Sequence, residues 1–104
     1  MTRDIPQDLY KAKVNLETAQ IAWKELQRLF AGGVVLMISR ELDLVEVAFQ
    51  ISKDNVGLIR GWAEQGKLLK VSDTQAASWF EDDALVWAVV ASPWVLVQPA
   101  DKLQ

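Results

Sequence analysis

The sequence predicts an α+β fold in a single small domain, with four to five helices packed on a sheet of three to five strands. Several segments carry apolar residues at helical spacing, and two others, including a long one near the C-terminus, are apolar almost throughout and contain several β-branched residues. A length of 104 residues suits one domain over residues 1–104, with its core over about residues 6–98 and short flexible ends. An apolar content of 51 % with 24 % charged residues is typical of a globular protein.

The N-terminal third predicts two helices. Pro6 suits the first turn of a helix over residues 6–16. Thr18 is a candidate N-cap for a second helix, which Gly32-Gly33 ends because glycine accepts the left-handed conformation. The apolar stripes behind this prediction are Leu9, Ala12 and Leu16 in the first helix, and Ala22, Leu26, Leu29 and Phe30 in the second.

A strand and an ambiguous segment follow. Residues 34–38 form a short apolar run whose β-branching suits a strand buried on both faces. Residues 43–52 fit a strand by alternation and a helix by spacing. Asp43-x-x-Glu46 resembles a capping box, so the helix is the favoured interpretation.

The next segments alternate between helix and strand. Asp54 or Asn55 caps a helix that ends at Gly66, and residues 68–71 suit a short strand. The capping box Ser72-x-x-Gln75 then opens a further helix, which the acidic run at residues 81–83 closes.

Residues 84–97 form a strongly β-prone stretch. Pro93 cannot donate a hydrogen bond to a neighbouring strand and therefore marks a turn, a bulge or an edge. A hairpin and one long bulged strand both fit this pattern.

The residue types that the chain lacks argue against catalysis. The sequence contains no histidine and no cysteine, so the commonest general base and the thiolate nucleophile are missing. It also contains no phosphate-binding glycine loop and no serine-hydrolase motif. We therefore expect no catalytic residue, no cofactor and no metal, and keep an enzyme that relies on carboxylate or lysine chemistry as a third hypothesis.

Charge and hydropathy bear on partners and location. The net charge of −3 and the scattered basic residues argue against binding to nucleic acid. The stretch from residue 84 to 97 is shorter than the roughly 20 residues of a membrane-spanning helix. No signal peptide is evident at the N-terminus, so we expect a cytoplasmic protein without membrane contact.

Five tryptophans suggest a binding role. Most are expected in the core, including Trp87 within the C-terminal stretch, but Trp62, Trp79, Pro93 and Trp94 are the candidates for interface or ligand contacts. The leading hypothesis is a non-enzymatic interaction module that forms a homodimer or binds another protein, since interfaces favour aromatic residues. The alternative is a small-molecule-binding domain with a tryptophan-lined pocket.

Three further patterns have both structural and functional interpretations. Gly57 and Gly61 lie within a predicted helix, where each costs stability, so they predict close packing against the same domain or a second subunit. Asp43 and Glu46 could form a carboxylate pair, but the capping box is favoured. Residues 81–83 could bind a hard cation, but a solvated turn is favoured because the spacing of a calcium loop is missing.

The chain also resembles a known family. The resembling segments are residues 15–19, 23–26, 42–48 and 91–98, together with Asp54 and Trp62. Through these residues the chain is similar to the uncharacterised bacterial domain-of-unknown-function family 2288, over roughly residues 9–98. The resemblance implies a bacterial, cytosolic protein and brings no activity, ligand or catalytic residue.

Overall fold

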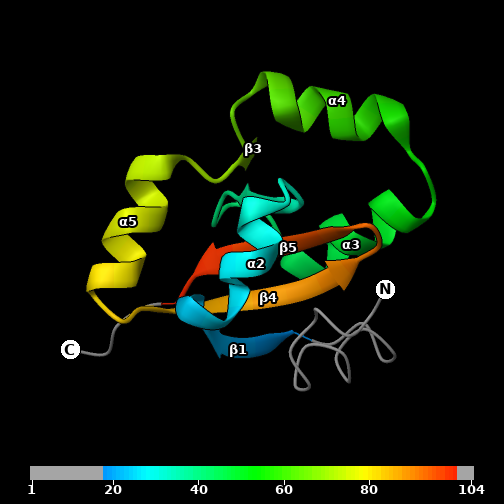
Figure 1. Ribbon diagram of the computed structural model, residues 1–104. Helices are drawn as coiled ribbons and strands as arrows, with labels where there is room; N and C mark the ends of the chain where they lie inside the picture. Colours follow the sequence, from blue (N-terminus) through cyan, green and yellow to red (C-terminus); the bar gives the residue numbers. More distant parts are fainter. Residues whose placement is uncertain (1–17, 101–104) are drawn as a thin grey trace.

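The computed structural model describes residues 18–100, which form one mixed five-stranded sheet with helices on both faces (Figure 1). The strands are β1 (Ala19–Ala22), β2 (Val35–Ile38), β3 (Leu68–Lys70), β4 (Leu85–Ala91) and β5 (Trp94–Pro99). Their spatial order is β1-β4-β5-β2-β3, so β5 is the middle strand. It runs antiparallel to β4 and parallel to β2.

The helices are the 3-10 helix η2 (Trp23–Leu26) and the α-helices α2 (Gln27–Ala31), α3 (Leu44–Ser52), α4 (Val56–Glu64) and α5 (Asp73–Glu81). Within the described part of the chain, four α-helices thus accompany five strands, which confirms the predicted α+β fold. The predicted helix over residues 6–16 lies outside the described residues.

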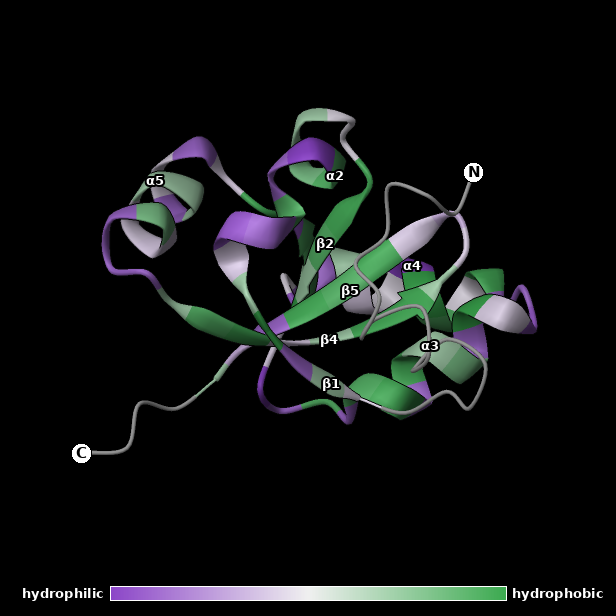
Figure 2. Ribbon diagram, turned by 60° about the horizontal axis from the view of Figure 1, so that its bottom comes forward, coloured by the Kyte–Doolittle hydropathy of each residue, from purple (hydrophilic) through white to green (hydrophobic). Residues whose placement is uncertain are grey.

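The sheet separates two apolar clusters. On one face, η2, α2 and α5 cover the sheet, and Trp23 and Trp79 pack together with ring centroids 5.0 Å apart. On the other face, α3 covers Val89 and Leu96. Figure 2 shows the apolar colouring of β2 and β5 and the mixed colouring of the helices, as expected for strands buried between two layers.

Residues 19–22 correct one prediction, because they form β1 and not the start of a helix capped by Thr18. β1 pairs antiparallel with β4, and Ile21 lies opposite Val86 in the buried cluster. Pairing with β4 satisfies the backbone and buries alternate side chains, so tertiary contacts outweigh the helical spacing. Helical structure starts only at Trp23 and ends at Ala31, with Gly32 as the C-cap.

The helix interpretation of residues 43–52 is correct. The side chain of Asp43 accepts hydrogen bonds from the backbone N–H groups of Val45 and Glu46, at 2.9 and 3.3 Å. This N-cap satisfies two of the donors that every helix leaves free at its start. The Glu46 carboxylate accepts from Gln50, so the Asp43–Glu46 pair serves helix α3.

The remaining helix caps and the hairpin also agree with the sequence. Asn55, one of the two predicted candidates, caps α4, and Ser72 caps α5 by accepting from the backbone N–H of Gln75 at 3.0 Å. Residues 85–99 form a hairpin of β4 and β5, which decides between the two interpretations of this stretch. Ser92 and Pro93 occupy its turn, and the peptide bond between them is cis.

The structure contains, among residues 18–100, no helix with the length and apolar character needed to cross a membrane.

Candidate functional site

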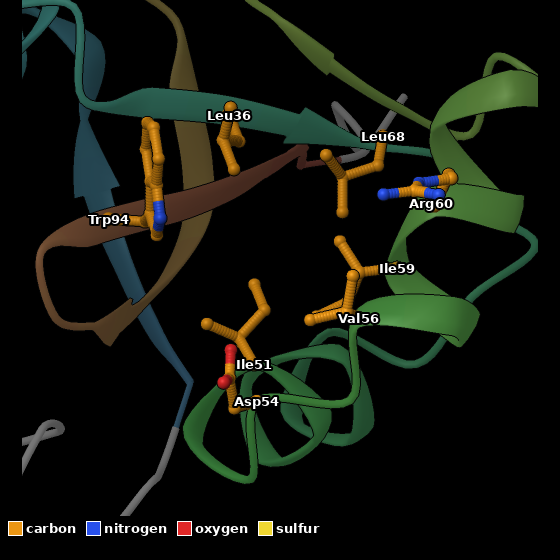
Figure 3. A pocket seen from close by; sticks show the side chains of 8 residues that line it. All are labelled: Leu36, Ile51, Asp54, Val56, Ile59, Arg60, Leu68 and Trp94. Atoms are coloured by element: carbon orange, nitrogen blue, oxygen red, sulfur yellow. The ribbon is translucent and has the colours of Figure 1, made fainter.

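An apolar pocket of about 480 Å³ lies between helix α4 and the sheet (Figure 3). This volume is within the range of about 300–1,000 Å³ that is usual for small-molecule sites. Its walls come from four parts of the fold: the sheet, the end of α3, the loop after α3, and α4. The lining residues are Leu36, Ile51, Asp54, Val56, Ile59, Arg60, Leu68 and Trp94.

The pocket exists because α4 does not pack fully against its neighbours. No residue of α4 is buried, and Val56 remains 52 % exposed. Ile59 and Trp62 are half-buried and contact the cluster beneath α3. The helix is therefore held by a few apolar contacts at its inner side, and the space between it and the sheet stays open.

The two helical glycines do not show the packing within the domain that the sequence predicts. A Cβ atom built at Gly57 or Gly61 would meet no heavy atom within 4 Å. Neither glycine therefore makes room for a close neighbour within the domain.

Two charged side chains, Asp54 and Arg60, complete the pocket. Asp54 has a positive φ of 58°, and its backbone N–H donates to the Ile51 carbonyl at 2.9 Å. Aspartate is one of the few residues that adopt this conformation readily. Figure 3 shows its carboxylate and the guanidinium of Arg60 directed toward the pocket from different sides.

The structure places the four predicted contact residues in different environments. Trp94 is half-buried and lines the pocket. Trp62 is half-buried against the α3 cluster and is not among the lining residues. Pro93 is exposed at the hairpin turn beside Trp94. Trp79 is only 7 % exposed and packs against Trp23 with the two rings tilted by 59°, so it belongs to the core of the opposite face.

Trp87 corrects the expectation that it lies in the core, because it is 39 % exposed. Its side chain is on the same face as Val89, but the apolar cluster under α3 reaches Val89 and Ala91 and stops short of Trp87. Leu85, two residues earlier on that face, is 46 % exposed. The start of β4 therefore carries two large apolar side chains that no described helix covers.

The acidic run at residues 81–83 lies at the exposed end of α5. Asp82 caps the helix C-terminus, and Asp83 has a positive φ of 53°. The carboxylate of Asp83 lies 3.4 Å from the ammonium group of Lys24. These contacts fit the predicted solvated turn.

Several pocket residues were not predicted as site residues. Val56 and Ile59 lie in the helix that is predicted to end at Gly66, and Leu36 and Leu68 lie in predicted strands, so the sequence pattern predicts only a structural role for all four. Nothing in their spacing distinguishes a stripe that is packed from one that faces a cavity. Arg60 carried one usable signal, since it interrupts a helix whose other inward positions are apolar.

The fold and the pocket define a small α+β domain with an apolar cavity under a peripheral helix. The chain belongs to the family described as "Protein of unknown function (DUF2288)", whose model matches residues 9–99. It is similar to a solved structure described as "NMR solution structure of PA1075 from Pseudomonas Aeruginosa", with 40 % sequence identity and a TM-score of 0.77. That match covers 100 % of this chain and 96 % of the other, and no curated protein matches.

Proposed function

We propose that this domain is a non-catalytic, bacterial cytoplasmic protein that binds a small molecule with an apolar body in the pocket under α4. The observation that carries the proposal is the pocket itself: six of its eight lining side chains are apolar, and Trp94 forms one wall. Removing apolar ligand surface from water supplies the main driving force at such a site. The absence of histidine and cysteine from the chain supports binding without catalysis.

Binding can be tested by titrating 1-hexanol, a neutral apolar probe, into ¹⁵N-labelled protein. We expect saturable shifts of the Trp94 indole N–H signal and of the backbone amides of Ile51, Ile59 and Leu68. The indole signal of Trp87 serves as the internal control, because that side chain lies outside the pocket lining. Non-saturable shifts, or equal shifts at Trp87, would contradict the proposal.

A matched pair of variants locates the probe. Val56 and Leu58 are both exposed residues of α4, but only Val56 lines the pocket. Val56→Trp should fill the cavity and abolish the Trp94 shift, whereas Leu58→Trp should leave it unchanged. Loss of binding in both variants would show that the probe depends on helix α4 as a whole and does not bind specifically in the cavity.

Self-association is the second candidate function, favoured by the exposed side chains of Leu85 and Trp87 on one face of β4. Two large apolar residues at the surface form the kind of patch that interfaces use. Size-exclusion chromatography with light scattering across micromolar concentrations tests it. A dimer that Trp87→Ser dissociates would support this candidate, and a monomer at every concentration would exclude it.

A further inference from the structure

The charges of Asp54 and Arg60 indicate the chemistry of the ligand. Both side chains line the pocket, and they are not paired with each other. Neither side chain has an ion pair or hydrogen bond with any residue in the range 18–100. The pocket thus presents one negative and one positive group, each free to meet a ligand, with an apolar wall between them (Figure 3).

We propose that the pocket binds a dipolar molecule with a carboxylate at one end, an ammonium group at the other and an aliphatic segment between them. This inference rests on the proposed function and adds the class of ligand. The guanidinium of Arg60 binds the carboxylate, for which its planar pair of donors is suited. The carboxylate of Asp54 accepts from the ammonium group, and the aliphatic segment lies against Ile59 and Leu68.

A ligand with a single charge fits this pocket less well. An anion would be attracted by Arg60 and repelled by Asp54, and a cation would meet the reverse arrangement. A dipolar ligand brings each end to its opposite charge. Its neutral middle also matches the apolar side chains of Ile51 and Ile59, where a charge would lose its hydration without a partner.

The positions of the two charged groups are set by different elements. Asp54 stands at the junction between α3 and α4, where its left-handed backbone and its hydrogen bond to Ile51 fix the direction of the side chain. Arg60 lies on the second turn of α4, between Ile59 and Gly61. The position of α4 over the sheet sets the distance between the Asp54 carboxylate and the Arg60 guanidinium. We therefore expect the pocket to select ligands whose two charged ends are separated by a matching length.

Four probes of similar size separate the contributions of the two charges. These are 6-aminohexanoate, hexanoate, hexylammonium and 1-hexanol, each titrated against the Trp94 indole signal. We expect 6-aminohexanoate to bind tightest, and removal of either charge to weaken binding about fivefold, as for an exposed ion pair worth about 1 kcal/mol. Aminoalkanoates of four and eight carbons should bind less tightly than the best-matched length.

Charge-neutralising variants assign each end of the probe. Arg60→Gln should make hexylammonium and 6-aminohexanoate bind equally, and Asp54→Asn should do the same for hexanoate and 6-aminohexanoate. Both side chains are exposed, so neither change should disturb folding. Glu64→Gln, an exposed change on the same helix outside the pocket lining, should leave all four affinities unchanged.

The outcomes separate this inference from the proposed function. Binding of 1-hexanol or hexanoate as tight as that of 6-aminohexanoate would overturn the dipolar ligand and leave the apolar pocket intact. Failure of all four probes, 1-hexanol included, would overturn both.

Discussion

Helices α4 and α5 both have nine residues, yet α5 buries Ala76 and Trp79 whereas α4 buries none of its residues. The difference follows from what each helix meets. α5 meets η2, where Trp23 is fully buried and provides a large flat partner for Trp79. α4 contacts α3 and the short edge strand β3, and therefore lies beyond the central part of the sheet.

Two similar helices thus serve different purposes in one domain. The layer of η2, α2 and α5 stabilises the fold through close aromatic packing. The layer of α3 and α4 is close-packed at α3 and open at α4, and the open part holds the pocket.

Trp23→Ala should reduce the free energy of unfolding by about 3–5 kcal/mol, because it leaves a cavity in the aromatic layer. Urea denaturation followed by circular dichroism measures this loss without depending on tryptophan fluorescence. Trp87→Ala, at a surface position, should cost less than about 1 kcal/mol. Similar losses in the two variants would contradict the assignment of Trp23 to the stabilising layer.

The same position offers a conservative variant. The indole N–H of Trp23 is buried and has no hydrogen-bond partner within the described residues. Trp23→Phe keeps an aromatic ring and removes this unsatisfied donor. It should therefore retain much of the stability that Trp23→Ala loses.

Gln98→Ala should reduce the free energy of unfolding by about 1–3 kcal/mol, because it removes the side-chain donor of the Leu42 carbonyl and one of the two donors of the Ser39 carbonyl, which keeps the N–H of Leu42 at 3.0 Å. The Gln98 amide donates to the carbonyl oxygens of Ser39 and Leu42, at 2.8 Å each, and so ties β5 to the loop before α3. Gln20→Ala, at an exposed position of β1, is the matched control and should be nearly neutral. Equal effects of the two substitutions in urea denaturation would show that the two hydrogen bonds of Gln98 do not contribute to stability.

Gly61→Ala should increase the free energy of unfolding by about 0.5–1 kcal/mol, since alanine favours the helix and its Cβ meets open space. Gly66→Ala should instead decrease it, because Gly66 has a φ of 77°. Thermal denaturation of the two variants measures both signs. A destabilised Gly61→Ala variant that also loses a dimer would indicate that α4 packs against a second copy.

The elements with local signals could be predicted from the sequence. Asp43, Asn55 and Ser72 cap their helices because a side-chain oxygen satisfies the backbone within three residues, so no distant contact is needed. β1 could not be predicted in this way. Ala19 and Ile21 become a strand only because β4, more than sixty residues later, provides the partner.

The candidate site was predicted only in part. Trp94 was identified because it follows Pro93 near the end of the β-prone stretch, and the hairpin indeed brings it to the edge of the pocket. Ile59 and Leu68 follow the same apolar pattern as core residues. They line the pocket only because α4 packs incompletely against the sheet. The size of a cavity depends on the distance between the packed helices and strands. The periodicity of side chains along the sequence does not determine that distance.

The position of β5 in the middle of the sheet has a consequence for synthesis of the chain. β5 is the last of the five strands to be translated, and within the sheet it alone joins β1 and β4 to β2 and β3. Until β5 has left the ribosome, the nascent chain holds two unjoined groups of strands whose edges carry unpaired backbone N–H and C=O groups. The sheet closes only after translation has passed this strand, so a stop codon before Trp94 would yield a chain without its centre and prone to aggregate.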